Sequence, residues 1–216
     1  MSMTGGSTPK VRIAILASGG GSNAECLMAH FAEGSGSEVG EVVWVGTNRM
    51  DAGVRAHARR HGIPESHVSK QAMNSGELLT ELRERGVEWI ALAGFLLRLP
   101  AEICEAYHQK LVNIHPALLP KHGGKGMFGM HVHRAVHASG DLRSGMTIHW
   151  VRPEYDEGDI LFQGEVALVE SDSPEDIAGK VLALEHRHYP PILEGLIRLS
   201  QGTDVRDATH LQSHKR

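Results

Sequence analysis

Short runs of Val, Ile, Leu and Ala alternate with helical patterns through the first half of the chain, and this alternation limits the possible folds. The apolar runs lie at 11–17, 41–47, 63–68, 89–94 and 111–115. Helices are expected between them, at 22–33, 51–61, 75–85 and 100–107. Nearly continuous apolar runs are typical of strands that are covered on both faces. The pattern therefore predicts an α/β fold with a mostly parallel, Rossmann-like sheet flanked by helices.

The second half of the chain has a different pattern. The runs MTIHWV (146–151) and DILFQGEVALV (159–169) are separated by only a short turn, so we expect later strands that are partly antiparallel. Ser173 and Pro174, followed by two acidic residues, form a typical helix start. This last helix is expected to run to about Leu199.

Length and charge limit the classes of protein that the chain can represent. With 216 residues it can form a single domain, expected at 11–200, and the polar segments 1–10 and 201–216 are expected to be disordered tails. The net charge is −4 with scattered Lys and Arg, so we expect no nucleic acid and no membrane as a partner. No membrane span or signal peptide is visible, which predicts a cytoplasmic location. The sequence leaves the oligomeric state open, a homodimer included.

A glycine-rich segment, SGGGSNAE at 18–25, joins the first expected strand to the first expected helix. Glycines let backbone N–H groups approach an anion, and a helix N-terminus favours negative charge, so Gly21, Ser22 and Asn23 are candidates for a phosphate site. The alternative is a tight turn in which Ser22 or Asn23 caps the helix. A dinucleotide site is disfavoured because the second strand ends without the acidic residue that would hold a ribose.

Asn113 and His115 lie on one face at the end of the fifth expected strand, where open α/β sheets build their sites. An amide and a protonated imidazole that converge on one point can stabilise the oxygen of a tetrahedral intermediate. A nearby carboxylate would raise the pKa of His115. The segment that follows the sixth expected strand supplies four candidates, Glu154, Asp156, Glu157 and Asp159.

The remaining histidines and the two cysteines do not indicate a metal site or a disulfide. His131, His133 and His137 have spacings that zinc accepts, but no Cys or carboxylate completes a ligand set. We therefore expect exposed or helix-capping histidines and no metal. Cys26 and Cys104 form no CxxC pair and are expected to be small buried side chains.

Several motifs in a fixed order resemble those of the folate-dependent formyltransferase superfamily. They are SGGGSN (18–23), LAGFLLRLP (92–100), NIHPALLP (113–120) and TIHWVRPEYDEGDILFQ (147–163). Within the superfamily the resemblance is to the phosphoribosylglycinamide formyltransferases of purine synthesis, since the chain has no room for the extra domains of methionyl-tRNA formyltransferase or formyltetrahydrofolate deformylase. It implies a formyltransferase fold and transfer of a formyl group from the co-substrate 10-formyltetrahydrofolate to the amine of 5'-phosphoribosylglycinamide (glycinamide ribonucleotide).

The resemblance also implies roles for individual residues. The catalytic positions of the family fall on Asn113, His115 and Asp156. Its ribonucleotide site falls on Gly21, Ser22, Asn23 and Glu185, with Lys125 expected to supply positive charge because the lysine of some relatives is Leu182 here. Its folate pocket falls on Gln71, Leu96, Leu97, Arg98, Leu99, Asn113, Arg152, Pro153, Glu154 and Tyr155.

The same residues are compatible with other functions. A formyltetrahydrofolate deformylase or a formyltransferase for another amine would use the same catalytic residues, and a non-catalytic phosphosugar- or nucleotide-binding protein would need only the glycine-rich loop.

The loop 121–131 is longer than in common relatives. We expect it to fold over the ribonucleotide, with Lys125 near the phosphate and Met127 or Phe128 excluding water. The alternative is that it packs against a neighbouring helix.

Overall fold

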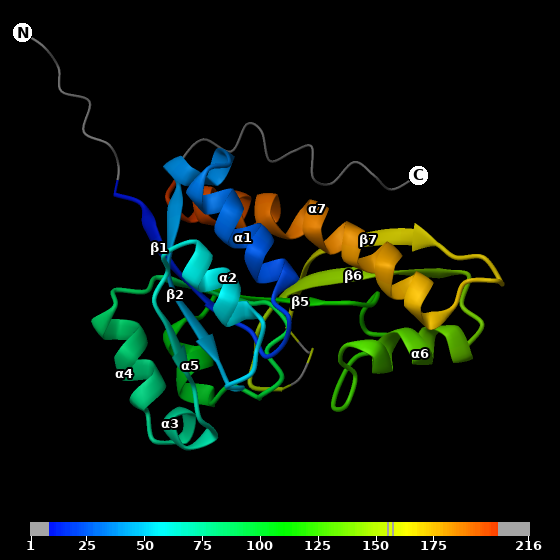
Figure 1. The fold of residues 1–216 in the computed structure, drawn as a ribbon, viewed down its shortest axis with the longest axis horizontal. Helices are drawn as coiled ribbons and strands as arrows, with labels where there is room; N and C mark the ends of the chain where they lie inside the picture. The colour runs from blue at the N-terminus through cyan, green and yellow to red at the C-terminus, as the bar shows by residue number, and fades with distance from the viewer. Residues whose placement is uncertain (1–8, 155, 157, 203–216) are drawn as a thin grey trace, which may run out of the picture.

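The computed structural model describes residues 9–154, 156 and 158–202 (Figure 1). Its centre is a seven-stranded sheet in the order β3-β2-β1-β4-β5-β6-β7. The strands from β3 to β5 pair in parallel, whereas β6 is antiparallel to β5 and β7 is antiparallel to β6. The strands are β1 Val11–Leu16, β2 Gly40–Thr47, β3 Glu65–His67, β4 Trp89–Leu92, β5 Leu111–His115, β6 Arg143–Trp150 and β7 Ile160–Ala167. The predicted mostly parallel sheet with an antiparallel C-terminal part is confirmed.

Helices cover both faces of the sheet (Figure 1). One apolar cluster joins the sheet to α1, α2, α6 and α7, and a second cluster joins the other face to α3, α4 and α5. The helices are α1 Ser22–Ala32, η1 (a 3-10 helix) Ser35–Glu38, α2 Val54–Arg60, α3 Lys70–Asn74, α4 Glu77–Glu84, α5 Ala101–Ala106, α6 Met130–Ala138 and α7 Pro174–Ser200.

The last helix begins as expected. Ser173 accepts a hydrogen bond from the N–H of Asp176, and the Asp176 side chain accepts one from the N–H of Ser173, so the two residues form a capping box before Pro174. Three of these helices were not expected: η1, the short α3 and the longer α6. Helix α6 occupies the end of the expected loop 121–131, so that part of the loop prediction was wrong. The expected tails lie almost wholly outside the described residues.

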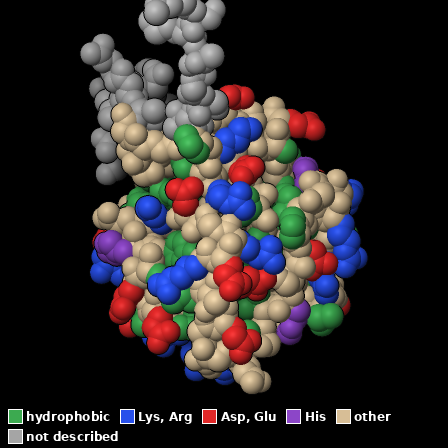
Figure 2. Space-filling model, turned by 90° about the vertical axis from the view of Figure 1, so that its left-hand side faces the viewer, with side chains coloured by type: hydrophobic (Ala, Val, Ile, Leu, Met, Phe, Trp, Pro, Cys, Tyr) green, Lys and Arg blue, Asp and Glu red, His purple; other side chains and the backbone are tan. Residues whose placement is uncertain are grey.

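The described surface mixes charges of both signs. On the face shown in Figure 2, Lys and Arg side chains lie between Asp and Glu side chains. Among the described residues, no helix is long and apolar enough to cross a membrane.

The sheet brings the candidate residues to one edge. Strands β1, β4 and β5 run parallel and are neighbours, so the segments after their carboxyl ends lie together. The glycine-rich loop follows β1, the segment 93–99 follows β4, and His115 ends β5. This is the edge at which open α/β sheets bind ligands.

Candidate active site

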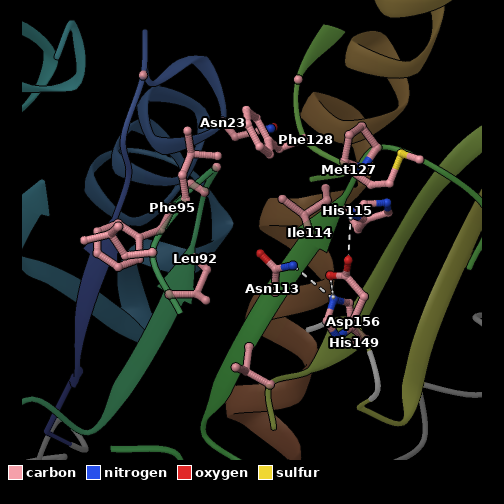
Figure 3. Close-up of a pocket in the computed structure, with 18 of the residues that line it drawn as sticks. Asn23, Leu92, Phe95, Asn113, Ile114, His115, Met127, Phe128, His149 and Asp156 are labelled. Carbon is pink, nitrogen blue, oxygen red and sulfur yellow. Dashed lines mark hydrogen bonds and ion pairs between the residues drawn. The ribbon is translucent and has the colours of Figure 1, made fainter. Parts of the chain in front are cut away.

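A pocket of about 540 Å³ lies at this edge of the sheet. It is formed by the glycine-rich loop, the segment after β4, the end of β5, the loop before α6 and the segment after β6 (Figure 3). The expected site residues that line it are Gly21, Ser22, Asn23, Leu96, Leu97, Arg98, Leu99, Asn113, His115, Lys125, Arg152, Pro153, Glu154, Asp156 and Glu185. Tyr155 lies outside the described residues. Gln71 is exposed on α3 and is not part of the lining, so the structure does not bring it to the other folate candidates.

The glycine-rich loop turns sharply into α1. Gly21 precedes the helix with φ of 84°, a left-handed conformation, and a Cβ atom there would lie 2.6 Å from Cβ of Val54. Neither Ser22 nor Asn23 caps the helix with its side chain, so the capping alternative is wrong. Without such a cap, the first N–H groups of α1 are available to an anion in the pocket.

Asn23 instead contacts helix α7. Its Nδ2 donates a hydrogen bond of 2.8 Å to Oε2 of Glu185, a carboxyl group of which only 7% is exposed. Burial raises the pKa of Glu185 to about 7, against the hydrogen bond from Asn23, which lowers it. Oδ1 of Asn23 is buried and has no hydrogen-bond partner among the described residues. One acceptor of the Asn23 amide is therefore left unsatisfied in the described part of the structure.

The raised pKa of Glu185 predicts a pH-dependent stability. The native state holds this proton more tightly than the unfolded chain, where the pKa is near 4.5, so stability should fall as pH rises from about 4.5 to about 7. At about 1.4 kcal/mol per unit, the cost above pH 7 is roughly 3 kcal/mol. Glu185→Gln removes the charge, so the variant should be more stable than the wild type near pH 8 but not near pH 4. Urea unfolding at both pH values measures this.

The exposed Glu165, paired with Arg143, provides the control for this comparison. Glu165→Gln should change the free energy of unfolding little, and equally at both pH values. An equal effect of Glu185→Gln at the two pH values would show that Glu185 carries no such charge cost.

At the end of β5, the amide of Asn113 points to a histidine on β6. The register places Asn113 opposite His149, and Nδ2 of Asn113 donates to Nε2 of His149 at 3.0 Å (Figure 3). Nδ1 of His149 donates to the carbonyl of Trp150, which leaves Nε2 as the acceptor. The second N–H of the Asn113 amide is not used by this contact.

His115 and Asp156 face each other in the pocket (Figure 3). Nδ1 of His115 lies 3.6 Å from Oδ2 of Asp156, and Oδ1 of Asp156 lies 3.6 Å from Nε2 of His149. Both distances are longer than a direct hydrogen bond. Nε2 of His115 donates at 2.9 Å to the carbonyl oxygen of His122. Asp156 is thus placed as expected, next to the imidazole of His115.

The protonation of His115 differs from the expectation. Burial lowers its pKa, and although Asp156 acts to raise it, the net shift is below the ordinary value, so the expected raised pKa was wrong. The reason is that only 4% of His115 is exposed. Burial would raise the pKa of Asp156, but contacts with His149, His115 and Gly124 hold it below its usual range, so this group carries a negative charge.

The two segments expected to bind folate contact each other. Arg98 donates to the carbonyl of Pro153 and lies 3.6 Å from Glu154. The N–H of Leu96 donates to Oγ of Ser18 at 2.8 Å, which ties the segment after β4 to the end of β1. The wall of the pocket between the glycine-rich loop and the segment after β6 is therefore connected by hydrogen bonds.

Sequence reasoning missed two histidines of the pocket. His149 was quoted within a motif but given no role, although its position opposite Asn113 follows from antiparallel pairing. His133 was expected to be exposed or helix-capping, and this was wrong: it is buried on α6, lines the pocket, and its Nδ1 has no partner among the described residues. Burial lowers the pKa of His133, and the neighbouring His115 lowers it further. It is buried beside Val132 and Val136, two apolar positions that give almost no periodic signal in the sequence.

Two expectations of smaller weight can also be compared with the structure. Cys104 is buried as expected, whereas Cys26 is only half-buried. The described residues contain no group of three or more His, Cys, Asp or Glu side chains arranged to hold a metal ion.

Comparison with known proteins places the chain in one family. The formyl transferase family model matches residues 11–193. The chloroplastic phosphoribosylglycinamide formyltransferase of Arabidopsis thaliana is 42% identical over 188 residues, which cover 84% of this chain and 64% of that protein. The phosphoribosylglycinamide formyltransferase of Escherichia coli is 32% identical, covering 85% of each. The chain thus spans less than two thirds of the plant relative's length.

Solved structures lead to the same family. The crystal structure of phosphoribosylglycinamide formyltransferase from Anaplasma phagocytophilum is 31% identical, covers 88% of each chain and superposes with a TM-score of 0.78. Glycinamide ribonucleotide transformylase 1 from Symbiobacterium toebii gives 31% identity, the same coverage and a TM-score of 0.79. With the family model matching most of its length, this chain belongs to the formyl transferase family.

Proposed function

We propose that this protein transfers the formyl group of 10-formyltetrahydrofolate to the amine of glycinamide ribonucleotide. One observation carries the proposal: the donors Asn113 and His115, with Asp156, share a single pocket with the uncapped N-terminus of α1. The residues that we propose for a phosphate and those that we propose for a developing oxyanion thus line one cavity. The names of the relatives support this substrate.

The chemistry follows from the charge that the reaction creates. The neutral amine attacks the formyl carbon, and its carbonyl oxygen becomes negative in the tetrahedral intermediate. The second N–H of Asn113 and the Nδ1 proton of His115 are the donors left for this oxygen, since Nε2 of His115 already donates to His122. Hydrogen bonds that strengthen as charge develops lower the barrier. When the bond from the formyl carbon to the folate nitrogen breaks, the carbonyl re-forms.

The lowered pKa of His115 is compatible with this role. The oxyanion that develops next to the imidazole favours its charged form, so the proton is held most tightly in the transition state. Asp156 stabilises the same charge. The attacking amine must lose a proton and the departing folate nitrogen must gain one. We propose that Asp156 orders a water that carries it.

The substrates would occupy two ends of the pocket. The phosphate lies against Gly21, Ser22 and Asn23, with Glu185 toward the rest of the ribonucleotide. The folate would lie against the segments 96–99 and 152–154. The loop before α6 contributes Lys125, Met127 and Phe128 to the lining, as the lid hypothesis requires.

The role of Lys125 is open to a direct test. Lys125 is exposed and lines the pocket, so we expect it to attract the phosphate. Lys125→Ala should weaken binding of glycinamide ribonucleotide about threefold to tenfold, the effect of an exposed charge, with folate binding unchanged. Titration calorimetry with each substrate measures this. Lys110→Ala, which removes an exposed lysine that does not line the pocket, is the matched control. Equal ribonucleotide affinity in Lys125→Ala and wild type would leave the phosphate to the loop 21–23 alone.

A deformylase is the second candidate, because it would need the same catalytic residues but would use water as the acceptor. Assays with 10-formyltetrahydrofolate and equal concentrations of glycinamide ribonucleotide, its unphosphorylated form or no amine separate the possibilities. Rapid turnover only with the ribonucleotide supports the proposal. Turnover at the same rate without any amine would show a hydrolase, and no turnover in any mixture would favour a binding protein.

Several further features belong to this proposal as predictions from the sequence. We propose that 10-formyltetrahydrofolate is a co-substrate, that no metal takes part, and that residues 11–200 act as one domain. A cytoplasmic location is also a proposal, since the plant relatives carry the description chloroplastic.

A further inference from the structure

A short segment at the edge of the pocket, of which only Gly124 lines the wall, contacts both members of the His115–Asp156 pair. The carbonyl oxygen of His122 accepts the Nε2 proton of His115 at 2.9 Å. Two residues later, the N–H of Gly124 donates to Oδ2 of Asp156 at 2.8 Å. The backbone at 122–124 thus supplies an acceptor to the imidazole and a donor to the carboxylate, which orients both groups.

This backbone follows an unusual path. His122 has φ of 56°, in the left-handed region that few residues other than glycine adopt. Gly123 lies so close to Leu119 that a Cβ atom would be 2.5 Å from its Cδ2. A side chain at 123 would therefore require Leu119 to move, and the strained residue 122 needs other interactions to hold it in place.

Asp141, which follows α6, provides these interactions. Its Oδ2 accepts from Nε2 of His122 at 2.9 Å and from Oγ of Ser139 at 2.7 Å, and its Oδ1 accepts from Nζ of Lys121. These hydrogen bonds from Lys121, His122 and Ser139 hold the pKa of Asp141 far below its usual range, so its carboxylate stays charged. We call Asp141 the anchor of His122. Asp141 and His122 are both absent from the residues that line the pocket.

We infer that Asp141 is a positioning residue for the reaction: by holding His122, it fixes the carbonyl that takes the Nε2 proton of His115 and so presents Nδ1 to the pocket. The kinetic part of this inference rests on the proposed function, whereas the structural part does not. The consequence is a specific tautomer. A neutral His115 carries its proton on Nε2, and a second proton can bind only at Nδ1, beside Asp156.

The pKa of His115 depends on the charged and polar groups around it. Asp156 acts to raise the pKa of His115, as does the hydrogen bond to the carbonyl of His122, whereas positive charge on His149 or His122 acts to lower it. His133 is a further neighbour, on α6. Loss of the carbonyl contact removes an acceptor that favours the charged imidazole, so the pKa of His115 should fall when the anchor is broken.

The kinetic test uses Asp141→Asn, which keeps the shape of the anchor and removes its charge. We expect kcat to fall about tenfold, the range found for partners that orient an active-site group, with KM for both substrates changed less than about twofold. Asp172→Asn is the matched control. Like Asp141, Asp172 pairs with a lysine, Lys180, and it does not line the pocket. It also accepts a hydrogen bond from a backbone N–H. The Asp172→Asn variant should leave kcat unchanged. A wild-type kcat in Asp141→Asn would overturn the kinetic role.

The structural test needs no substrate and therefore separates this inference from the proposed function. Nitrogen-15 NMR of the free protein should show the Nε2-protonated tautomer of His115 in the wild type. In Asp141→Asn we expect a mixture of tautomers and a lower pKa of His115. His122→Phe, which keeps the backbone carbonyl but cannot bind Asp141, should give the same change in tautomer, and the double variant should be no worse than either single one. An unchanged His115 spectrum in folded Asp141→Asn and His122→Phe would overturn the inference, whatever reaction the protein catalyses.

Discussion

His115→Ala is expected to lower kcat by about a hundredfold or more while the protein remains folded. In the proposed reaction, the imidazole is one of two side-chain donors for the oxygen that becomes negative, and loss of one such donor typically costs about 10² to 10³ in rate. Because the interaction strengthens in the transition state, KM should change much less than kcat. Steady-state kinetics with both substrates, together with thermal unfolding, measures these quantities.

A histidine outside the pocket provides the control for this variant. His137 is exposed on the same helix as His133 and does not line the pocket, so His137→Ala should keep wild-type kcat. A His115→Ala variant with near-wild-type turnover would remove His115 from the catalytic group.

Asp156→Asn is expected to lower kcat to a similar extent, about a hundredfold, because the variant can neither stabilise the charged imidazole nor order a water for proton transfer. It should also lower the pKa of His115 further, since Asp156 acts to raise it. If the protonated imidazole is the active form, the rate falls as pH rises through this pKa, and the fall should occur at lower pH in the variant. Its pH–rate profile and an NMR titration of His115 measure the two effects.

The matched variant for Asp156→Asn is Asp159→Asn. Asp159 is exposed and pairs with Arg152 on the same segment, but it is not part of the pocket lining. It should leave the pKa of His115 unchanged. If Asp156→Asn leaves that pKa unchanged as well, the two groups are not coupled.

The sheet could be predicted because a strand covered on both faces needs a continuous apolar run, and such runs can be seen in the sequence. Helix α6 could not be predicted in the same way. Only Val132 and Val136 supply buried apolar side chains among its nine residues, and the third buried residue is His133. A short helix with two apolar positions gives almost no periodic signal, so its histidines were interpreted as a surface group.

The sequence predicted the parts of the candidate site that depend on the type of side chain. It did not predict the parts that depend on backbone groups or on burial. Asn113 and His115 share a pocket as expected, but the role of His122 is exerted through a carbonyl oxygen, which every residue has. The pKa of His115 depends on how deeply the strand end is buried, which the sequence does not contain. His149 was within reach, because the register of two antiparallel strands could have placed it opposite Asn113.

The fate of the formyl carbon tests the central claim most directly. Purified protein is mixed with glycinamide ribonucleotide and 10-formyltetrahydrofolate labelled with carbon-13 at the formyl group, and the label is followed by NMR. The account predicts that the label passes to the formamide carbon of the formylated ribonucleotide, one for each tetrahydrofolate formed, and that Asn113→Ala, His115→Ala and Asp156→Asn all slow this transfer. Label that appears as free formate, or that stays on the folate, would contradict it.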